Sequence, residues 1–213
     1  MATFETREQA GKVLGHELSN RLDLHDPVVY GLPRGGVVVA REVAAVLKTP
    51  LDVVVSRKIG APGNPEYALA AVDQDGKVTT PWNDSPHASS SLLMKAITRG
   101  ARRELAEARR RAHTYHSHSG VIDPAGREVV LVDDGIATGL TMDAAVRYVR
   151  RHGARRIVVA APVASIEAVR SLQQIADQVV VLFAPPGFRA VSQHYDHFQQ
   201  VTDSEVLQAL RTG

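Results

Sequence analysis

Two adjacent carboxylates, Asp133 and Asp134, stand where an apolar run ends and a run of small residues begins. The segment reads EVVLVDDGIATGLTMDAAVRYV over residues 128–149, which predicts a buried strand, a short loop and a helix. Ionised carboxylates only accept hydrogen bonds, and each hydroxyl of a sugar needs an acceptor. Because carboxylates touching a phosphate would repel it, we expect the two acids to bind the hydroxyls of a phosphorylated ribose.

The loop that follows the two acids is suited to a phosphate group. Small residues let backbone N–H groups wrap a phosphate at a helix N-terminus, and threonine hydroxyls add donors. Taken singly, two acids can be a polar strand end and Thr-Gly an ordinary helix entry. A Walker A loop is excluded because no Gly-Lys-Ser/Thr is present. The residues expected around the phosphate are Gly135, Ile136, Ala137, Thr138, Gly139 and Thr141.

A second strand, loop and helix occur at residues 30–43, YGLPRGGVVVAREV. Gly35 and Gly36 permit close backbone approach, and Arg34 supplies a permanent forked charge for phosphate oxygens. The alternative is a Pro-Arg-Gly-Gly surface turn. The segment therefore predicts a second anion-binding loop, with Arg34 as its cation.

A third segment, SRKIGAPGNPEYALAAV at residues 56–72, places Arg57 and Lys58 after a strand. The dense glycine and proline of GAPGNP predict a loop without regular structure. Taken by themselves, both cations can be ordinary charges at a strand end.

The elements that must position these loops alternate along the chain. A capping box of Thr6 and Gln9 predicts a helix over 7–22, and apolar runs predict strands over 27–31 and 51–56. Asp75-Gly76 predicts a hairpin that makes one sheet edge mixed, followed by a long helix over about 89–115. Strands and helices then alternate to the end. The expected fold is α/β, a mostly parallel twisted sheet flanked by helices, with ligands beyond the carboxyl ends of its strands.

Composition limits the remaining classes of protein. The 213 residues are 44% hydrophobic, enough for one domain over 1–213 with a full core. No cysteine and no long apolar run occur, which favours a cytoplasmic protein without disulfides, thiolate sites or membrane spans. The net charge of +2 does not favour nucleic acid, and the arginine-rich segment 95–111 reads as a solvated helix face. His113, His116 and His118 match no strong metal spacing, so no protein metal site is expected.

Taken together, VDDGIATGLT, GLPRGG and RKIGAPGNPEYALAAV resemble the type I phosphoribosyltransferases, and in particular bacterial stand-alone members of unassigned acceptor. The resemblance covers roughly residues 27–160. It implies that residues 133–141 bind phosphoribosyl pyrophosphate (PRPP) and that residues 32–36 form the pyrophosphate loop, in which the bond before Arg34 is often cis. Ala137 departs from the members with an aspartate there, so no general base follows from that position.

The resemblance further implies an enzyme that transfers the phosphoribosyl group to a nitrogenous acceptor, such as a purine or pyrimidine base. Arg34, Arg57 and Lys58 would be its catalytic cations, the last two beside a flexible loop that closes over PRPP. Mg²⁺ would bind mainly through the pyrophosphate, and the protein would be a homodimer. A hood insertion is expected at about 81–120, and Phe183, Phe188 or Tyr195 could stack on the acceptor. One alternative is a non-catalytic PRPP or nucleotide sensor on the same fold. The other is a hydrolase or a kinase-like Rossmann protein, but this sequence contains neither a nucleophile elbow nor a Walker A loop.

Overall fold

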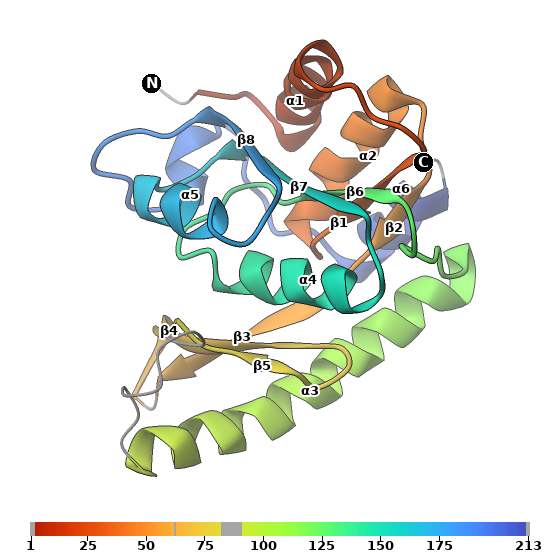
Figure 1. Ribbon diagram of the computed structural model, residues 1–213. Coiled ribbons are helices and arrows are strands. Elements are labelled where there is room, and N and C mark those ends of the chain that lie inside the picture. Colours follow the sequence, from red (N-terminus) through yellow and green to blue (C-terminus); the bar gives the residue numbers. More distant parts are fainter. Residues whose placement is uncertain (1–2, 62, 82–90, 212–213) are drawn as a thin grey trace.

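The computed structural model describes residues 3–61, 63–81 and 91–211, and it contains a five-stranded parallel sheet in the order β2-β1-β6-β7-β8 (Figure 1). Every strand pair in this sheet is parallel, as expected for apolar strands separated by helices. The α/β fold with helices on both faces is thus confirmed. The five strands are β1 (Pro27–Gly31), β2 (Leu51–Val53), β6 (Glu128–Val132), β7 (Arg156–Val163) and β8 (Gln178–Phe183).

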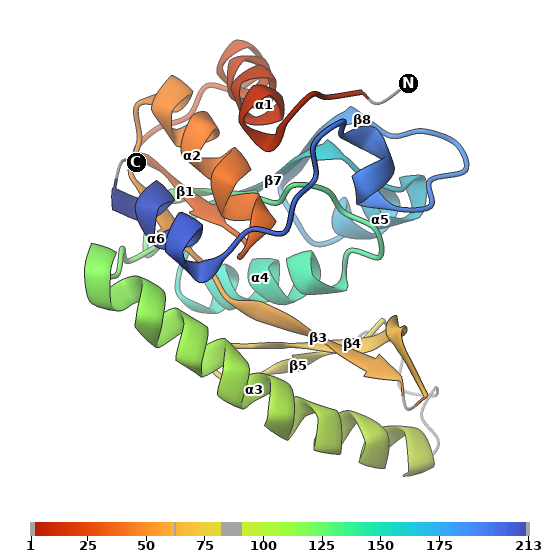
Figure 2. The ribbon, with the colours of Figure 1, turned by 180° about the vertical axis from the view of Figure 1, so that it is seen from behind.

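Helices cover the two faces of this sheet (Figures 1 and 2). On one face, α1 (Arg7–Arg21), α2 (Gly35–Leu47) and α6 (Asp203–Arg211) share a core with residues of β1, β6 and β7. On the other face, α4 (Leu140–Arg151) and α5 (Ile166–Leu172) form a second core with the same strands. The predicted cap of α1 is confirmed, since the Thr6 hydroxyl accepts from the Gln9 N–H at 3.2 Å.

A second, antiparallel sheet lies below α4 in Figure 1, in the order β3-β4-β5. Its strands are β3 (Ser56–Ala61), β4 (Asn64–Asp73) and β5 (Val78–Thr79). The predicted hairpin at Asp75-Gly76 is confirmed, and Gly76 has a φ of +94°. The prediction that this hairpin borders the main sheet was wrong, because it pairs with β3 instead.

The small sheet is packed between two helices. Ile59 and Val72 contact the long helix α3 (Ser91–Ser119) through Ile97, whereas Ala71 packs against Leu140 of α4. The chain therefore adds two layers, the small sheet and α3, to the helix–sheet–helix core (Figure 1). The single domain with a hood at about 81–120 stays a prediction, and residues 82–90 of that segment lie outside the described ranges.

The segment GAPGNP, residues 60–65, corrects one expectation in part. It was predicted to be a loop without regular structure, but β3 extends to Ala61, β4 begins at Asn64, and these two residues pair. Residue 62 lies outside the described ranges. Register shifts between Ile59, Gly60 and Ala61 accommodate the glycine in the ladder. β-bulges of this kind let glycine sit in a strand pair, which sequence rules treat as a break.

Candidate functional site

The predicted site residues follow three neighbouring strands. Gly31, the last residue of β1, pairs with Val53 of β2 on one side and with Val132 of β6 on the other. The backbone hydrogen bond from Leu32 N–H to the Val132 carbonyl, at 2.9 Å, continues this pairing into the loops. Because the strands are parallel, all three loops leave the same edge of the sheet, where open α/β sheets bind their ligands.

The loop after β6 is held firmly at the N-terminus of α4. Ile136 is buried, and its N–H donates to the Val163 carbonyl at 2.9 Å. The Ser165 hydroxyl donates to the Ala137 carbonyl at 2.7 Å, which also turns that carbonyl away from the loop. Ala137 and Thr138 are exposed, and Gly139 precedes α4 with a φ of +78°. Ile136 therefore anchors a loop whose exposed part ends at helix N–H groups suited to an anion.

The two acids are packed within this loop. The Asp134 N–H donates to the Asp133 Oδ1 at 2.8 Å, and Asp134 Oδ2 lies 2.7 Å from Arg7 Nε. Burial raises the pKa of the Asp133 carboxyl, and the nearby charge of Asp134 raises it further. Burial also raises the pKa of Asp134, which the Arg7 charge opposes. Ionisation of either carboxyl is therefore unfavourable unless a cation or a hydrogen-bond donor pairs with it.

The loop after β1 lies directly against the acids. A Cβ placed on Gly35 would be 1.9 Å from Asp134 Oδ2, and one on Gly36 would be 2.8 Å from the Asp133 Cα. Only glycine fits at these two positions, so the predicted close approach is real. The peptide bond between Pro33 and Arg34 is cis, which confirms the bond singled out from the sequence.

Arg34 lies beside the N-terminus of α6, with Nη1 3.8 Å from Asp203 Oδ1. That carboxylate also accepts from the Tyr115 hydroxyl at 2.8 Å and pairs with Arg110 at 3.1 Å. Arg34 is therefore paired with one acid of α6, which is itself bound by Tyr115 and Arg110 of α3. A guanidinium held this way at the strand edge is suited to phosphate oxygens.

Arg57 and Lys58 lie on opposite faces of β3, so the structure does not bring both to the strand edge together. Arg57 pairs across the ladder with Val72, on the α3 face, and its Nη2 is 2.9 Å from the carboxylate of Glu104. Lys58 pairs with Ala71, which packs against α4. Residues directly opposite in a ladder share a face, so Lys58 faces α4 and Arg57 faces away from it.

Several residues that shape the site were missed from the sequence, because their contacts join distant segments. Arg7 belongs to α1, whose pattern predicts only a helix, yet it binds Asp134, 127 positions away. Tyr195 donates to the Asp134 carbonyl at 2.6 Å from the far end of the chain. No local signal marks either residue. Ser165 is the one with a partial signal, since its serine caps α5 by accepting from Ala168.

The three aromatic residues predicted as possible stacking partners of an acceptor differ in burial. Tyr195 is 5% exposed and packs between Phe4 and Phe198, so its ring is part of the core. Phe183 is 40% exposed and lies edge-on to His194, whose other neighbour is Phe188 at a ring distance of 5.5 Å. Phe183 and Phe188 therefore remain the aromatic candidates near β8.

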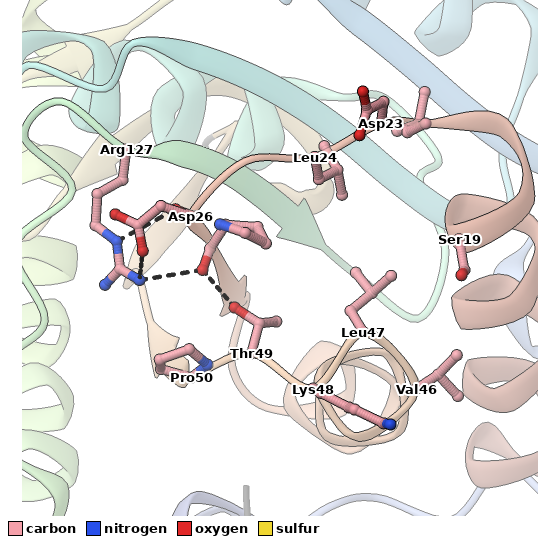
Figure 3. Close-up of a pocket in the computed structure, with 12 residues that line it drawn as sticks. Ser19, Asp23, Leu24, Asp26, Val46, Leu47, Lys48, Thr49, Pro50 and Arg127 are labelled. Carbon is pink, nitrogen blue, oxygen red and sulfur yellow. Dashed lines mark hydrogen bonds and ion pairs between the residues drawn. The ribbon is translucent and has the colours of Figure 1, made fainter.

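Two cavities bear on the position of the site. One of about 350 Å³ lies beside the loop after β6, where it is lined by Thr138, Gly139 and Leu140 together with Tyr67 and Leu172. The other, of about 450 Å³, is shown in Figure 3. It is lined by the segment that leads into β1 and by the segment that follows α2. Arg127, which also lines it, is paired with Asp26 at 2.9 Å. None of the predicted site residues lines this second cavity, so it does not belong to the strand-edge site.

Within the described ranges, no three histidine or acidic side chains gather as a metal site would require. His116 contacts Asp52 at 3.2 Å.

Over the described part of the chain, no helix has the length and apolar content needed to cross a bilayer.

The fold and site define a class of protein with a parallel α/β sheet and glycine-containing loops that meet beyond its strand ends. The model of the phosphoribosyl transferase domain family matches residues 5–182, so the chain belongs to that family. Proteins named "Putative phosphoribosyl transferase" from Mycobacterium tuberculosis strains CDC 1551/Oshkosh and ATCC 25618/H37Rv are 42% identical over 207 residues. The match covers 97% of this chain and 46% of theirs, so the chain spans about half the length of these relatives.

The crystal structure of TT1426 from Thermus thermophilus is also similar to this chain. It shares 47% sequence identity and a TM-score of 0.81, with 97% of each chain covered. With 97% of the chain covered, the likeness extends beyond residue 182, where the family's matched segment ends.

Proposed function

We propose that this protein transfers the 5-phosphoribosyl group of PRPP to a nitrogenous acceptor and releases pyrophosphate. The observation that carries the proposal is the contact between the two loops, in which Gly35 and Gly36 touch Asp134 and Asp133. This contact joins a phosphate-binding loop, two hydroxyl acceptors and Arg34 at one strand edge, the combination that a sugar with two phosphate groups needs.

PRPP would lie across the edge with its 5-phosphate on the α4 N-terminus, at Thr138, Gly139 and Thr141. Asp133 would accept from the ribose hydroxyls, with Asp134 beside it. The pyrophosphate would face Arg34 and Lys58. Mg²⁺ suits this arrangement, since it binds phosphate oxygens and waters with few protein ligands, and it would neutralise charge on the pyrophosphate.

The residues act mainly on charge that develops during bond breaking. As the bond between the anomeric carbon and the pyrophosphate oxygen breaks, the sugar becomes positive and the pyrophosphate gains negative charge. Arg34 and Lys58 would stabilise the leaving group. The acceptor nitrogen forms its bond to the anomeric carbon from the opposite side, and positioning supplies much of the rate. Ala137 offers no base, so the acceptor's proton leaves to solvent or to a group outside the loop.

A PRPP sensor without turnover is the second candidate, and the place of Arg57 favours it. Only one of the two cations after β2 faces α4, whereas Arg57 is bound by Glu104 on α3. A screen for pyrophosphate release from PRPP with purine and pyrimidine bases tests the two functions. Release that depends on one base supports the transferase. PRPP binding without release for any base supports the sensor.

Substitution of Lys58 by alanine is expected to lower the rate of pyrophosphate release by about 100-fold, because one stabilising donor in such a site is worth this much. Arg57→Ala is the matched control on the other face of β3. It should change the rate less than about tenfold and instead lower the stability, because it leaves Glu104 buried without this partner. Equal rates for both variants would contradict the assignment of Lys58.

We also propose that the protein forms a homodimer, as the family resemblance implies. Sedimentation at several protein concentrations measures this directly, and a single monomer mass at all concentrations would contradict it.

A further inference from the structure

Arg7 joins both ends of the chain to the loop that we assign to PRPP. Its Nε lies 2.7 Å from Asp134 Oδ2, and its Nη1 donates to the Gln199 carbonyl at 2.9 Å. The guanidinium carbon is 3.8 Å from the centre of the Phe198 ring. Arg7 is only 8% exposed, although arginine is rarely buried unless it is paired. A guanidinium bound on three sides is fixed in direction as well as in charge.

The second support of Asp134 comes from the same C-terminal segment. The Tyr195 hydroxyl donates to the Asp134 carbonyl at 2.6 Å, and the Tyr195 ring packs on Phe4 and Phe198. Side chain and backbone of Asp134 are thus both held by residues outside the loop. Gly35 closes the arrangement, since a Cβ on it would meet Asp134 Oδ2 at 1.9 Å and Arg7 Nε at 2.9 Å.

We propose that Arg7 is a positioning residue of the PRPP site, which aims the Asp134 carboxylate along the contact between the two substrate loops. This inference rests on the proposed function. It assigns to α1 and to residues 195–199 a part in substrate binding that the loop motif does not contain.

The charges around Asp134 give the inference a pH signature. The groups that act on its carboxyl are Asp133 in its own loop and Arg7 from α1, and the Tyr195 hydroxyl donates to its carbonyl. Burial raises the pKa of Asp134, and Arg7 opposes this rise. Without Arg7 the carboxylate would be protonated at higher pH, and a protonated acid donates where a ribose hydroxyl needs an acceptor. PRPP binding would then be lost earlier as the pH falls.

The test measures the dissociation constant of PRPP with Mg²⁺ between about pH 5 and about pH 9 for the whole chain and its Arg7→Gln variant. We expect about tenfold weaker binding at neutral pH, as for a misplaced site group. The midpoint of the acid loss should rise by about one pH unit, the effect of removing an adjacent opposite charge. Arg7→Lys should restore the midpoint because it keeps the charge. Arg21→Gln, an exposed arginine of the same helix, is the control and should match wild type.

The outcomes separate this inference from the proposed function. No PRPP binding by wild type would overturn the proposed function itself. If wild type binds PRPP and Arg7→Gln has the same dissociation constant and the same acid midpoint of binding, only the role of Arg7 is overturned. If Arg7→Gln does not fold, Asp134→Asn decides, because it is isosteric and removes the titrating group. Its acid midpoint should differ from wild type, and an identical profile would overturn the inference.

Discussion

Replacement of Asp133 by asparagine is expected to abolish PRPP binding and at the same time to stabilise the protein. Partial burial beside a second carboxylate raises the pKa of Asp133 and makes its charge unfavourable in the folded state. Asparagine keeps the carbonyl oxygen that accepts the Asp134 N–H, but it loses the charge. We therefore expect the variant to have a higher free energy of unfolding than wild type at pH values above the ordinary pKa of an aspartate.

The sign of the pH dependence follows from the raised pKa. Between the ordinary pKa of an aspartate and the raised value, the folded state binds more protons than the unfolded state. The stability that wild type gains from this carboxyl is therefore present at low pH and is lost as the pH rises through the folded pKa. The stabilisation by Asp133→Asn should therefore be complete at pH values above the raised pKa of Asp133, and absent below the ordinary pKa of an aspartate.

Urea unfolding at several pH values measures the effect, with Asp196→Asn as the control at an exposed aspartate. The control should leave both stability and PRPP binding unchanged. A variant at Asp133 that loses stability at neutral pH, or that binds PRPP as wild type does, would contradict this account of the acid.

Gly35→Ala is expected to have the largest effect on structure. The added Cβ would lie 1.9 Å from Asp134 Oδ2 and 2.9 Å from Arg7 Nε, and displacing either atom disturbs the partly buried ion pair between them. We expect a loss of about 2 to 3 kcal/mol in the free energy of unfolding, as for overpacking of a well-filled site. PRPP binding should fall with it, because the two loops are forced apart.

Gly126→Ala is the matched control for this prediction. Gly126 has a φ of +74° and no neighbouring atom within 4 Å of an added Cβ, so alanine there meets only backbone strain. Strain of that kind costs about 1 kcal/mol. Thermal unfolding of the two variants compares them, and equal losses would mean that close approach to Asp134 contributes nothing.

Much of the fold could be predicted because local signals and sheet rules agree with the tertiary structure. The strand at residues 27–31 was predicted to the residue, since Pro27 opens an apolar run and Gly31 ends it. The alternation of strands and helices indicated the parallel sheet, and its connectivity placed Arg34 and Asp133 at one edge. The cis bond before Arg34 came from the family resemblance, and no local rule would predict it.

The remaining features depend on contacts between segments far apart in the sequence. Ser56–Ala61 was expected to be partly loop, yet it pairs with β4 because bulges absorb its glycine. Arg57 and Lys58 were expected to act together, but a strand alternates its faces and Glu104 on α3 binds the first of them. The place of Arg7 against Asp134 is set by how both chain ends pack on the sheet, which no spacing of residues encodes.

Calorimetric titration of PRPP with Mg²⁺ into wild type and Asp133→Asn protein tests the central claim most directly. The account predicts saturable binding at one site per chain for wild type and no detectable binding for the variant, while the variant remains folded. Absence of binding to wild type, or equal binding to both proteins, would contradict the assignment of this strand edge to PRPP.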